Sequence, residues 1–534
     1  MKKRFIPLLI TFIIGLIYFY FVLPPLNPTA FSFWVFVALL TVTFLVLNAS
    51  SKAFENVQVL IEGRVPKSVG KEEIAIISAV GTILGLILLI NFFMSPIFIS
   101  NKYATRIAVD DDKEFTEDVK TVDPTKLPVI DKASSMRLGD RVMGRMPDLV
   151  SQFYVSTLYT QINYNNDIVR VTPLEYSDIF KVIANRKNGI EGYIKVNSVT
   201  GEADLVRLEE GMKYMNSAIF NKNLDRSLRF SYPTKIFGAK AFEIDDDGNP
   251  YWIVPTLKYN GINIRAEVNG AIILDPITGE SDFYEVDNVP EWVDHVYPSS
   301  LVLEQVNDWG TYTNGFFNSL FGQRGVVVTT QGYNYTVMND DVYLYTGITS
   351  VISDESNIGF ILTNLRTKQT SYYAAPGAEE FSAMNSAQGQ VQQMNYNSTF
   401  PLLVNINNKP TYFVSLKDNA GLVKMFAFVD VADYQKVVVT DSSFGIEEAI
   451  KNYMGDEDVI VGNETNTETI EVVDITSAII SGNTFYYILD SNDNVYKVNL
   501  IVNESLLPFV KIGDSITIEY NESSTINIIN SIER

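Results

Sequence analysis

Two stretches of this chain match each other closely: Val196-Asn197-Ser198-Val199-Thr200-Gly201-Glu202 and Leu274-Asp275-Pro276-Ile277-Thr278-Gly279-Glu280. A looser copy follows at Thr363-Asn364-Leu365-Arg366-Thr367-Lys368-Gln369. Each copy lies between two runs rich in β-branched and aromatic residues. Asn or Asp opens each copy, and in the first two copies Gly can supply a positive φ. The pattern predicts a β-hairpin turn that recurs along the chain.

A second similarity extends the repeat. Pro250-Tyr251-Trp252-Ile253-Val254 is similar to Pro410-Thr411-Tyr412-Phe413-Val414, and each stretch comes just after a polar turn. Aromatic and β-branched residues of this kind favour strands. We therefore expect a fourth unit that ends near Val439, although its turn at 429–433 lacks the Thr-Gly-Glu sequence.

The predicted unit has paired strands, a D/N-x-x-T-G-E hairpin and a following helical segment, and it resembles PepSY-like domains. This resemblance implies small α+β modules outside a bacterial membrane, often beside peptidases or sensor proteins. The third and fourth units depart from the Thr-Gly-Glu pattern. The whole layout also resembles a group of uncharacterised bacterial membrane-anchored proteins, from which no activity is carried over.

Three apolar runs dominate the first hundred residues, at 6–23, 31–47 and 74–99. Runs of about 17–26 residues are long enough to cross a hydrocarbon core of roughly 30 Å as helices. No ionisable residue lies within the three runs, and a proton or ion path normally needs one. The sequence therefore predicts a three-helix transmembrane anchor rather than a transporter.

Basic residues lie before the first apolar run and in the loop between the second and third runs. Lys2-Lys3-Arg4 precedes the first run, and the loop at 49–73 contains Lys52, Arg64, Lys67 and Lys71. The loop at 24–30 carries no charge. The positive-inside rule then places the N-terminus and the 49–73 loop in the cytoplasm. Three crossings leave residues 101–534 on the extracytoplasmic side of a multi-pass protein of the cell membrane.

Gly81 and Gly85 in the third run have the spacing of a close helix–helix contact. Two interpretations stay open for this pair. The glycines pack within the helical anchor, or they join two copies of the chain into a homo-oligomer.

The predicted fold class is α+β, with four segments. Residues 1–100 form the transmembrane anchor, 101–135 an acidic linker, and 136–445 the PepSY-like α+β repeat region. Residues 456–534 contain five short strand-like runs, which predict a small OB-like β-barrel.

The composition excludes several classes of site. The 534 residues carry a formal net charge of −22, with no Cys and one His. A chain without Cys has no disulfide, no thiolate nucleophile and no Cys-ligated zinc, and a single His excludes metal motifs that need two imidazoles. The acidic excess argues against nucleic acid as a partner.

Few residues of the sequence are candidates for catalysis or metal binding. A histidine normally titrates near neutral pH, so His295 could act as a general base. Adjacent residues such as Asp294 do not face each other on a helix, so we interpret His295 as a surface or structural residue. Asp245-Asp246-Asp247-Gly248-Asn249 is similar to a calcium loop, yet Thr256 stands where an EF-hand needs its glutamate. Turn formation before a strand explains this stretch better, and also Asp490-Ser491-Asn492-Asp493-Asn494. We assign no catalytic, cofactor-binding or metal-binding residue, and no cofactor.

The sequence thus predicts a non-enzymatic, membrane-anchored scaffold or binding protein of the bacterial cell envelope. Its expected partners are the lipid bilayer and either an envelope protein or a cell-wall polymer. Two alternatives stay open. The PepSY resemblance implies a regulator or inhibitor of an extracytoplasmic peptidase, and a carboxylate-dependent cell-wall hydrolase needs only two acids roughly 5–10 Å apart.

Overall fold

The computed structural model describes residues 2–61, 71–111, 113–351, 353–455, 466–480, 483–492, 494–521 and 527–534. Arg64 and Lys67 of the predicted cytoplasmic loop lie outside these residues, as do Ser68 and Asp112. Helix accounts for 34% and strand for 36% of the structure, which confirms the α+β class. The chain divides into two units, and unit 1 comprises Met1–Asp118, Pro128–Ala383 and Phe400–Leu402. Unit 2 comprises Val119–Leu127, Met384–Thr399 and Leu403–Arg534.

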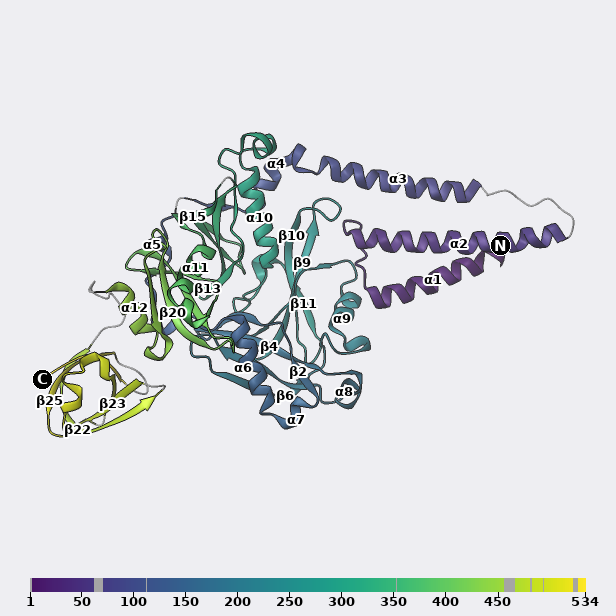
Figure 1. Ribbon diagram of the computed structural model, residues 1–534. Helices are drawn as coiled ribbons and strands as arrows, with labels where there is room; N and C mark the ends of the chain where they lie inside the picture. The colour runs from purple at the N-terminus through teal and green to yellow at the C-terminus, as the bar shows by residue number, and fades with distance from the viewer. Residues whose placement is uncertain are drawn as a thin grey trace. The chain divides into compact units, whose positions relative to one another are not determined.

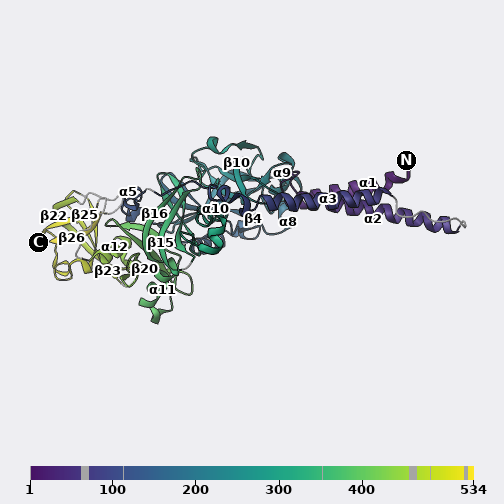
Figure 2. The same ribbon diagram turned by 90° about the horizontal axis from the view of Figure 1, so that it is seen from above.

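Unit 1 begins with apolar helices (Figure 1). They are α1 (Lys2–Val22), α2 (Phe31–Ile61), α3 (Lys71–Phe93) and the shorter α4 (Pro96–Ala104). Phe31–Ser51 and Ala75–Phe93 are long and apolar enough to cross a membrane, and Ile6–Val22 is a shorter apolar stretch. α1 and α2 lie side by side in both views (Figures 1 and 2), and the rings of Tyr18 and Phe36 stack 5.5 Å apart between them.

Four antiparallel sheets follow one plan. The plan has five strands, counted here in chain order. The first and second strands both pair with the third, the third pairs with the fourth, and the fourth pairs with the fifth. The first sheet contains β2 (Phe153–Val155), β3 (Thr160–Tyr164), β4 (Asp167–Tyr176), β5 (Ile190–Asn197) and β6 (Ala203–Met212). The second contains β7 (Ile236–Phe237), β8 (Ala241–Ile244), β9 (Pro250–Tyr259), β10 (Ala266–Leu274) and β11 (Ser281–Tyr284).

The third sheet completes unit 1, and the fourth lies in unit 2. The third contains β12 (Val327–Thr329), β13 (Asn334–Met338), β14 (Asp341–Ser350), β15 (Ser353–Asn364) and β16 (Thr370–Ala378). The fourth contains β17 (Asn397–Ser398), β18 (Leu402–Ile406), β19 (Lys409–Lys417), β20 (Val423–Asp430) and β21 (Val437–Asp441). In the predicted linker 101–135, β1 (Val109–Asp110) pairs in parallel with β16.

Short helices connect and cover the sheets. In unit 1 they are α5 (Phe115–Asp118), α6 (Lys132–Gly144), α7 (Pro147–Val150), α8 (Ile179–Ala184), α9 (Leu224–Ser231) and α10 (Ser299–Tyr312). The single turns η2 (Phe220–Lys222), η3 (Val286–Asn288) and η4 (Asn318–Gly322) also lie there. α11 (Glu380–Gln390) precedes the fourth sheet, and α12 (Ile446–Met454) packs on β20 and β21. The turns of unit 2 are η1 (Pro124–Lys126), η5 (Gln392–Met394), η6 (Ser442–Phe444), η7 (Leu500–Asn503) and η8 (Leu507–Phe509).

The recurring hairpin turn is confirmed. It joins β5 to β6, β10 to β11 and β15 to β16. The side chains of Asn197, Asp275 and Asn364 each accept the backbone N–H groups two and three residues further on. Gly201 has φ of +76° and, where the third copy lacks Gly, Lys368 has φ of +68°.

The last segment forms a closed five-stranded barrel in the order β22-β23-β24-β26-β25. β24 and β26 are parallel, and the other neighbours are antiparallel. The bounds are β22 (Asn466–Ile480), β23 (Asn483–Asp490), β24 (Val495–Asn499), β25 (Ser515–Asn521) and β26 (Asn527–Glu533). Buried side chains such as Ile488, Tyr496 and Ile516 fill its core.

Candidate functional site

The segment around α9 binds the C-terminal end of α1. A helix ends with carbonyl oxygens that have no partner within the helix. Nε of Arg226 donates to the carbonyl of Tyr20 at 3.2 Å, and Nε of Arg229 donates to the carbonyl of Leu23 at 3.0 Å. The ring of Phe230 meets the ring of Phe19 edge-on, with centroids 5.6 Å apart. Figure 1 accordingly draws α9 beside the end of α1.

Arg229 is the centre of this junction, because its side chain is buried, donates to carbonyl oxygens and stacks on the ring of Phe237, with Cζ 4.3 Å from the ring centroid. Its Nη1 donates to the carbonyls of Tyr232 at 3.3 Å, Pro233 at 3.4 Å and Lys235 at 2.6 Å. Burial lowers the pKa of Arg229 to about 10, so the guanidinium stays charged at neutral pH. The partial negative charge at a helix C-terminus favours a cation at this position.

The start of α2 and the end of α3 contact the second sheet as well. The backbone N–H of Asn263, in the turn between β9 and β10, donates to the carbonyl of Thr29 at 2.8 Å. Asn91 on α3 pairs with the backbone of Ile262 in both directions: its Nδ2 donates to the carbonyl and its Oδ1 accepts the N–H, each at 3.0 Å. This pairing satisfies the amide of Asn91, which interrupts an apolar run and would otherwise be costly to bury.

Arg106 holds the chain that follows α4. Its side chain is 1% exposed and binds Glu267 of β10 at 3.0 Å, Glu304 of α10 at 2.6 Å, and Asp308 of α10. Burial alone would lower the pKa of Arg106, but the hydrogen bonds and charges of Glu304 and Asp308 outweigh it and raise the pKa. The ends of all three long helices, or the chain next to them, are thus tied by polar contacts to α9, to α10 and to the second sheet of unit 1.

His295 lies in a second polar cluster. Its Nε2 is 2.7 Å from the carbonyl of Gln161 on β3, so Nε2 carries the proton of the neutral ring. The ring of Tyr335 stands at right angles to the imidazole, with centroids 5.6 Å apart. Burial lowers the pKa of His295 to about 4. A neutral imidazole that donates its proton to a backbone carbonyl is a structural group here.

Two carboxylates complete this cluster. Glu243 of β8 is 0% exposed and Asp294 is 2% exposed. Glu243 accepts the N–H groups of Asp294 at 2.8 Å and His295 at 3.0 Å. Asp294 accepts the N–H groups of Asn163 on β3 at 2.8 Å and Val342 on β14 at 3.2 Å. The two acids therefore link three sheets of unit 1.

Burial raises the pKa of Glu243. Burial, and then the negative charge of Glu243, raise the pKa of Asp294. A glycosidase needs two acids, one with a raised pKa and one ionised, in a cleft that a polysaccharide can enter. Here the carboxylate oxygens of Glu243 and Asp294 accept backbone N–H groups, and both side chains are buried between sheets. We therefore interpret this pair as structural. Sequence reasoning missed Glu243, because no motif separates it from the other acids of the chain.

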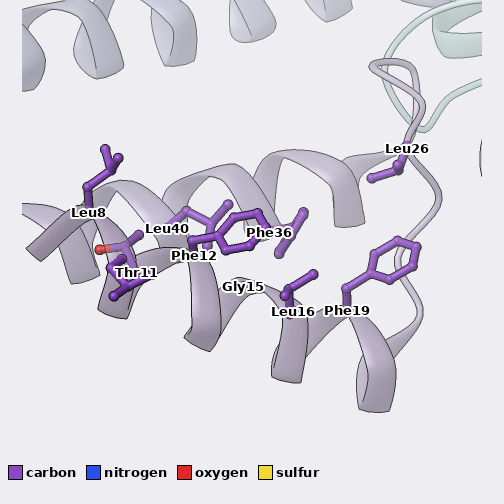
Figure 3. Close-up of a pocket in the computed structure, with 10 residues that line it drawn as sticks. Leu8, Thr11, Phe12, Gly15, Leu16, Phe19, Leu26, Phe36 and Leu40 are labelled. Carbon is purple, nitrogen blue, oxygen red and sulfur yellow. The ribbon is translucent and has the colours of Figure 1, made fainter. Parts of the chain in front are cut away.

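A groove of about 720 Å³ runs between α1 and α2 (Figure 3). Its lining is apolar apart from Thr11, whose hydroxyl donates to the carbonyl of Pro7 at 2.8 Å. The lining residues are Leu8, Leu9, Thr11, Phe12, Gly15, Leu16, Phe19, Leu26, Phe36 and Leu40. Such a groove can hold hydrocarbon but offers no reacting group.

The other residues singled out in the sequence have local roles. A Cβ added to Gly81 or Gly85 would meet no described atom within 4 Å, so neither glycine has a packing partner in the described part of this single chain. Asp245 accepts the N–H groups of Asp247 at 3.1 Å and Asn249 at 2.8 Å, which makes a turn before β9. Asp490 forms the same kind of turn before β24. Among the described residues, no group of three or more His, Cys, Asp or Glu could hold a metal ion.

No protein-family model matches this chain, and no curated protein matches it. The junction between the long helices and the sheets is therefore interpreted from its own contacts. Charge alone could have pointed to the α9 part of this junction, because α9 lies in a basic stretch of an acidic chain.

Proposed function

We propose that this chain is a multi-pass, membrane-anchored scaffold or binding protein of a bacterial cell envelope, without enzymatic activity. In this proposal α1, α2 and α3 each cross the membrane, and the N-terminus is cytoplasmic. Residues 101–534 are extracytoplasmic and bind an envelope protein or a cell-wall polymer.

One observation carries the proposal: the end of α1, the start of α2 and the end of α3 all contact the part of unit 1 between α9 and β10. Arg229 binds the carbonyl that follows α1, Thr29 just before α2 binds Asn263, and Asn91 near the end of α3 binds Ile262. If each of the three helices crosses the membrane once, these three points lie on the same side of the membrane. The basic residues near the opposite ends support a cytoplasmic location for those ends.

The helix lengths are compatible with three crossings. α1 has 21 residues and α3 has 23, which correspond to roughly 30–35 Å at the rise of an α-helix. The hydrocarbon core is about 30 Å thick. α1 is therefore long enough to cross, although its apolar stretch is shorter than those of α2 and α3.

The topologies of the sheets and of the barrel support the proposal of PepSY-like repeats followed by an OB-like barrel. Each sheet has the same strand order and follows a helix, which is what a repeated PepSY-like α+β unit requires. The barrel has five strands, and its third and fifth strands are the parallel pair. This topology favours an OB-like barrel.

Cysteine labelling tests the topology, because the chain contains no native Cys. Ser68→Cys marks the predicted cytoplasmic loop, and Asp246→Cys marks the exposed turn before β9. In intact spheroplasts a membrane-impermeant maleimide should label position 246 and leave position 68 unlabelled until the cells are lysed. Equal labelling of both positions in intact cells would contradict three crossings.

Point variants in the barrel test the binding role. Phe509 and Ile512 are 65% and 67% exposed and flank Lys511 in the segment between β24 and β25. We expect the detergent-solubilised full chain to co-sediment with isolated cell-wall sacculi, and Phe509→Ser with Ile512→Ser to abolish this. The matched control is Phe321→Ser, which removes an 81% exposed ring outside the barrel. No co-sedimentation of the unmodified chain would exclude the wall polymer and favour a protein partner.

A further inference from the structure

The segment 211–242 has a charge opposite to that of the whole chain. It contains six Lys and Arg against one acidic residue, Asp225, a net charge of +5 in a chain of net −22. Asp225 pairs with Lys240 at 2.6 Å. Among the described residues, no carboxylate lies within ion-pair distance of Lys213 or Lys222. Both of these side chains are partly exposed. Nζ of Lys222 also lies 3.8 Å from the centroid of the Tyr214 ring, which leaves its charge without a carboxylate partner.

This basic segment also exposes two aromatic rings. Phe220 is 67% exposed and Phe230 is 56% exposed. Phe220 is also held in a left-handed backbone conformation, with φ of +51°. A bulky side chain is rarely found there, and such strain persists only where the surrounding structure imposes it. Here Nη1 of Arg226 donates to the carbonyl of Phe220 at 2.7 Å and helps to hold the turn.

The basic segment lies at the end of α1. Arg226 not only binds the carbonyl of Tyr20 but also stacks on its ring, with Cζ 4.2 Å from the ring centroid. The backbone N–H of Leu26 donates to the carbonyl of Pro233 at 2.7 Å. If α1 crosses the membrane, these contacts hold the cations and the exposed rings at the level of the lipid head groups. Lys and Arg side chains next to exposed aromatic rings are a common means by which proteins bind anionic lipid surfaces.

We infer that the basic segment 211–242 binds the head groups of anionic phospholipids beside the end of α1. The inference rests on the proposed anchor and adds a second, charge-dependent contact between the protein and the membrane. Lys213 and Lys222 attract the phosphates, and the ring of Phe220 enters the interface. The contact orients the sheets of unit 1 on the membrane.

A fluorescent probe tests the inference in the full chain. Asn221→Cys, in an exposed position next to Phe220, carries a polarity-sensitive dye, and the chain is reconstituted into vesicles. Phosphatidylglycerol added to phosphatidylcholine should shift the emission to the blue, and high salt should reverse the shift because salt screens exposed charges. Lys213→Glu with Lys222→Glu should abolish the shift. The matched control, Lys409→Glu with Lys451→Glu, makes the same charge change in unit 2 and should retain it.

A second probe separates this inference from the proposed anchor. Leu88 of α3 is 72% exposed, so Leu88→Cys places the dye within the stretch proposed to cross the membrane. The inference would be overturned, and the anchor left intact, by two results together. The dye at position 88 would report hydrocarbon, and the emission of the dye at position 221 would not change with the charge of the lipid. A dye at Leu88 in water would overturn the anchor itself. The salt reversal needs no lysine variant, so a variant that fails to fold does not prevent a result.

Discussion

Among single residues, Phe220 combines a strained backbone with an exposed ring. A left-handed conformation costs a non-glycine residue about 1 kcal/mol or more, and Asn tolerates it better than Phe. We expect Phe220→Asn to raise the free energy of unfolding by about 1 kcal/mol and to weaken the response of the Asn221 probe to anionic lipid. Thermal unfolding in detergent measures the first effect.

Phe230→Asn is the matched control for this prediction. Phe230 is also exposed, but it lies in α9 and packs against Phe19 and Tyr20. Its replacement should lower the stability rather than raise it. A loss of stability in Phe220→Asn as well would mean that the turn at Phe220 stores no backbone strain.

His295 should titrate far below its usual range. The unfolded imidazole takes up a proton below a pKa of 6.5, whereas the folded one does so only near 4. The folded state therefore loses stability as the pH falls from 6.5 to 4, by about 3 kcal/mol at most. Because the chain has one His, a single imidazole resonance in an NMR titration reports this pKa directly.

His295→Gln provides the comparison. The variant should show no His-dependent loss of stability between pH 6.5 and 4, and the functions proposed above should survive. A pKa near 6.5 in the unmodified chain would show that the imidazole is solvated. Loss of wall or lipid binding in His295→Gln would contradict its structural role.

At the scale of elements, the hairpin between β10 and β11 depends on Gly279. Gly279 and Gly315 both have φ of +86°, but a Cβ at Gly279 would collide with the ring of Tyr214, whereas one at Gly315 would meet nothing within 4 Å. Gly315→Ala should therefore cost only the backbone strain, about 1 kcal/mol. Gly279→Ala should cost about 3 kcal/mol, because the ring must also move. Denaturant unfolding compares the two, and equal losses would contradict the packing of Tyr214 over this turn.

At the scale of the whole molecule, Arg229 joins the end of α1 to the segment that contains α9. Arg229→Gln leaves several buried carbonyls without a donor, and we expect a loss of about 3 kcal/mol. We also expect faster proteolysis at residues 23–30, because the chain after α1 loses its attachment. Limited proteolysis with mass spectrometry measures the cleavage. Arg207→Gln is the control, since its ion pair with Asp148 is exposed on both sides and contributes little to stability.

Local sequence was enough to predict the α+β class, the apolar helices and the recurring hairpins. The length of an apolar run is a property of neighbouring residues. The hairpin turn is also local, because Asn197 and Asp275 bind N–H groups only two and three residues away. The turns at Asp245 and Asp490 follow from the same short-range chemistry.

Only the tertiary structure brought the polar junctions together. Arg226 and Arg229 each bind a carbonyl 206 residues away, and His295 meets a carbonyl 134 residues away. These contacts use backbone carbonyls, which every residue offers, so no side-chain pattern marks the partner. Whether an acid such as Glu243 is buried depends on how the sheets pack against one another. Length, charge and turn residues are therefore properties of the sequence itself, whereas the junctions and the altered pKa values arise when distant segments exclude water together.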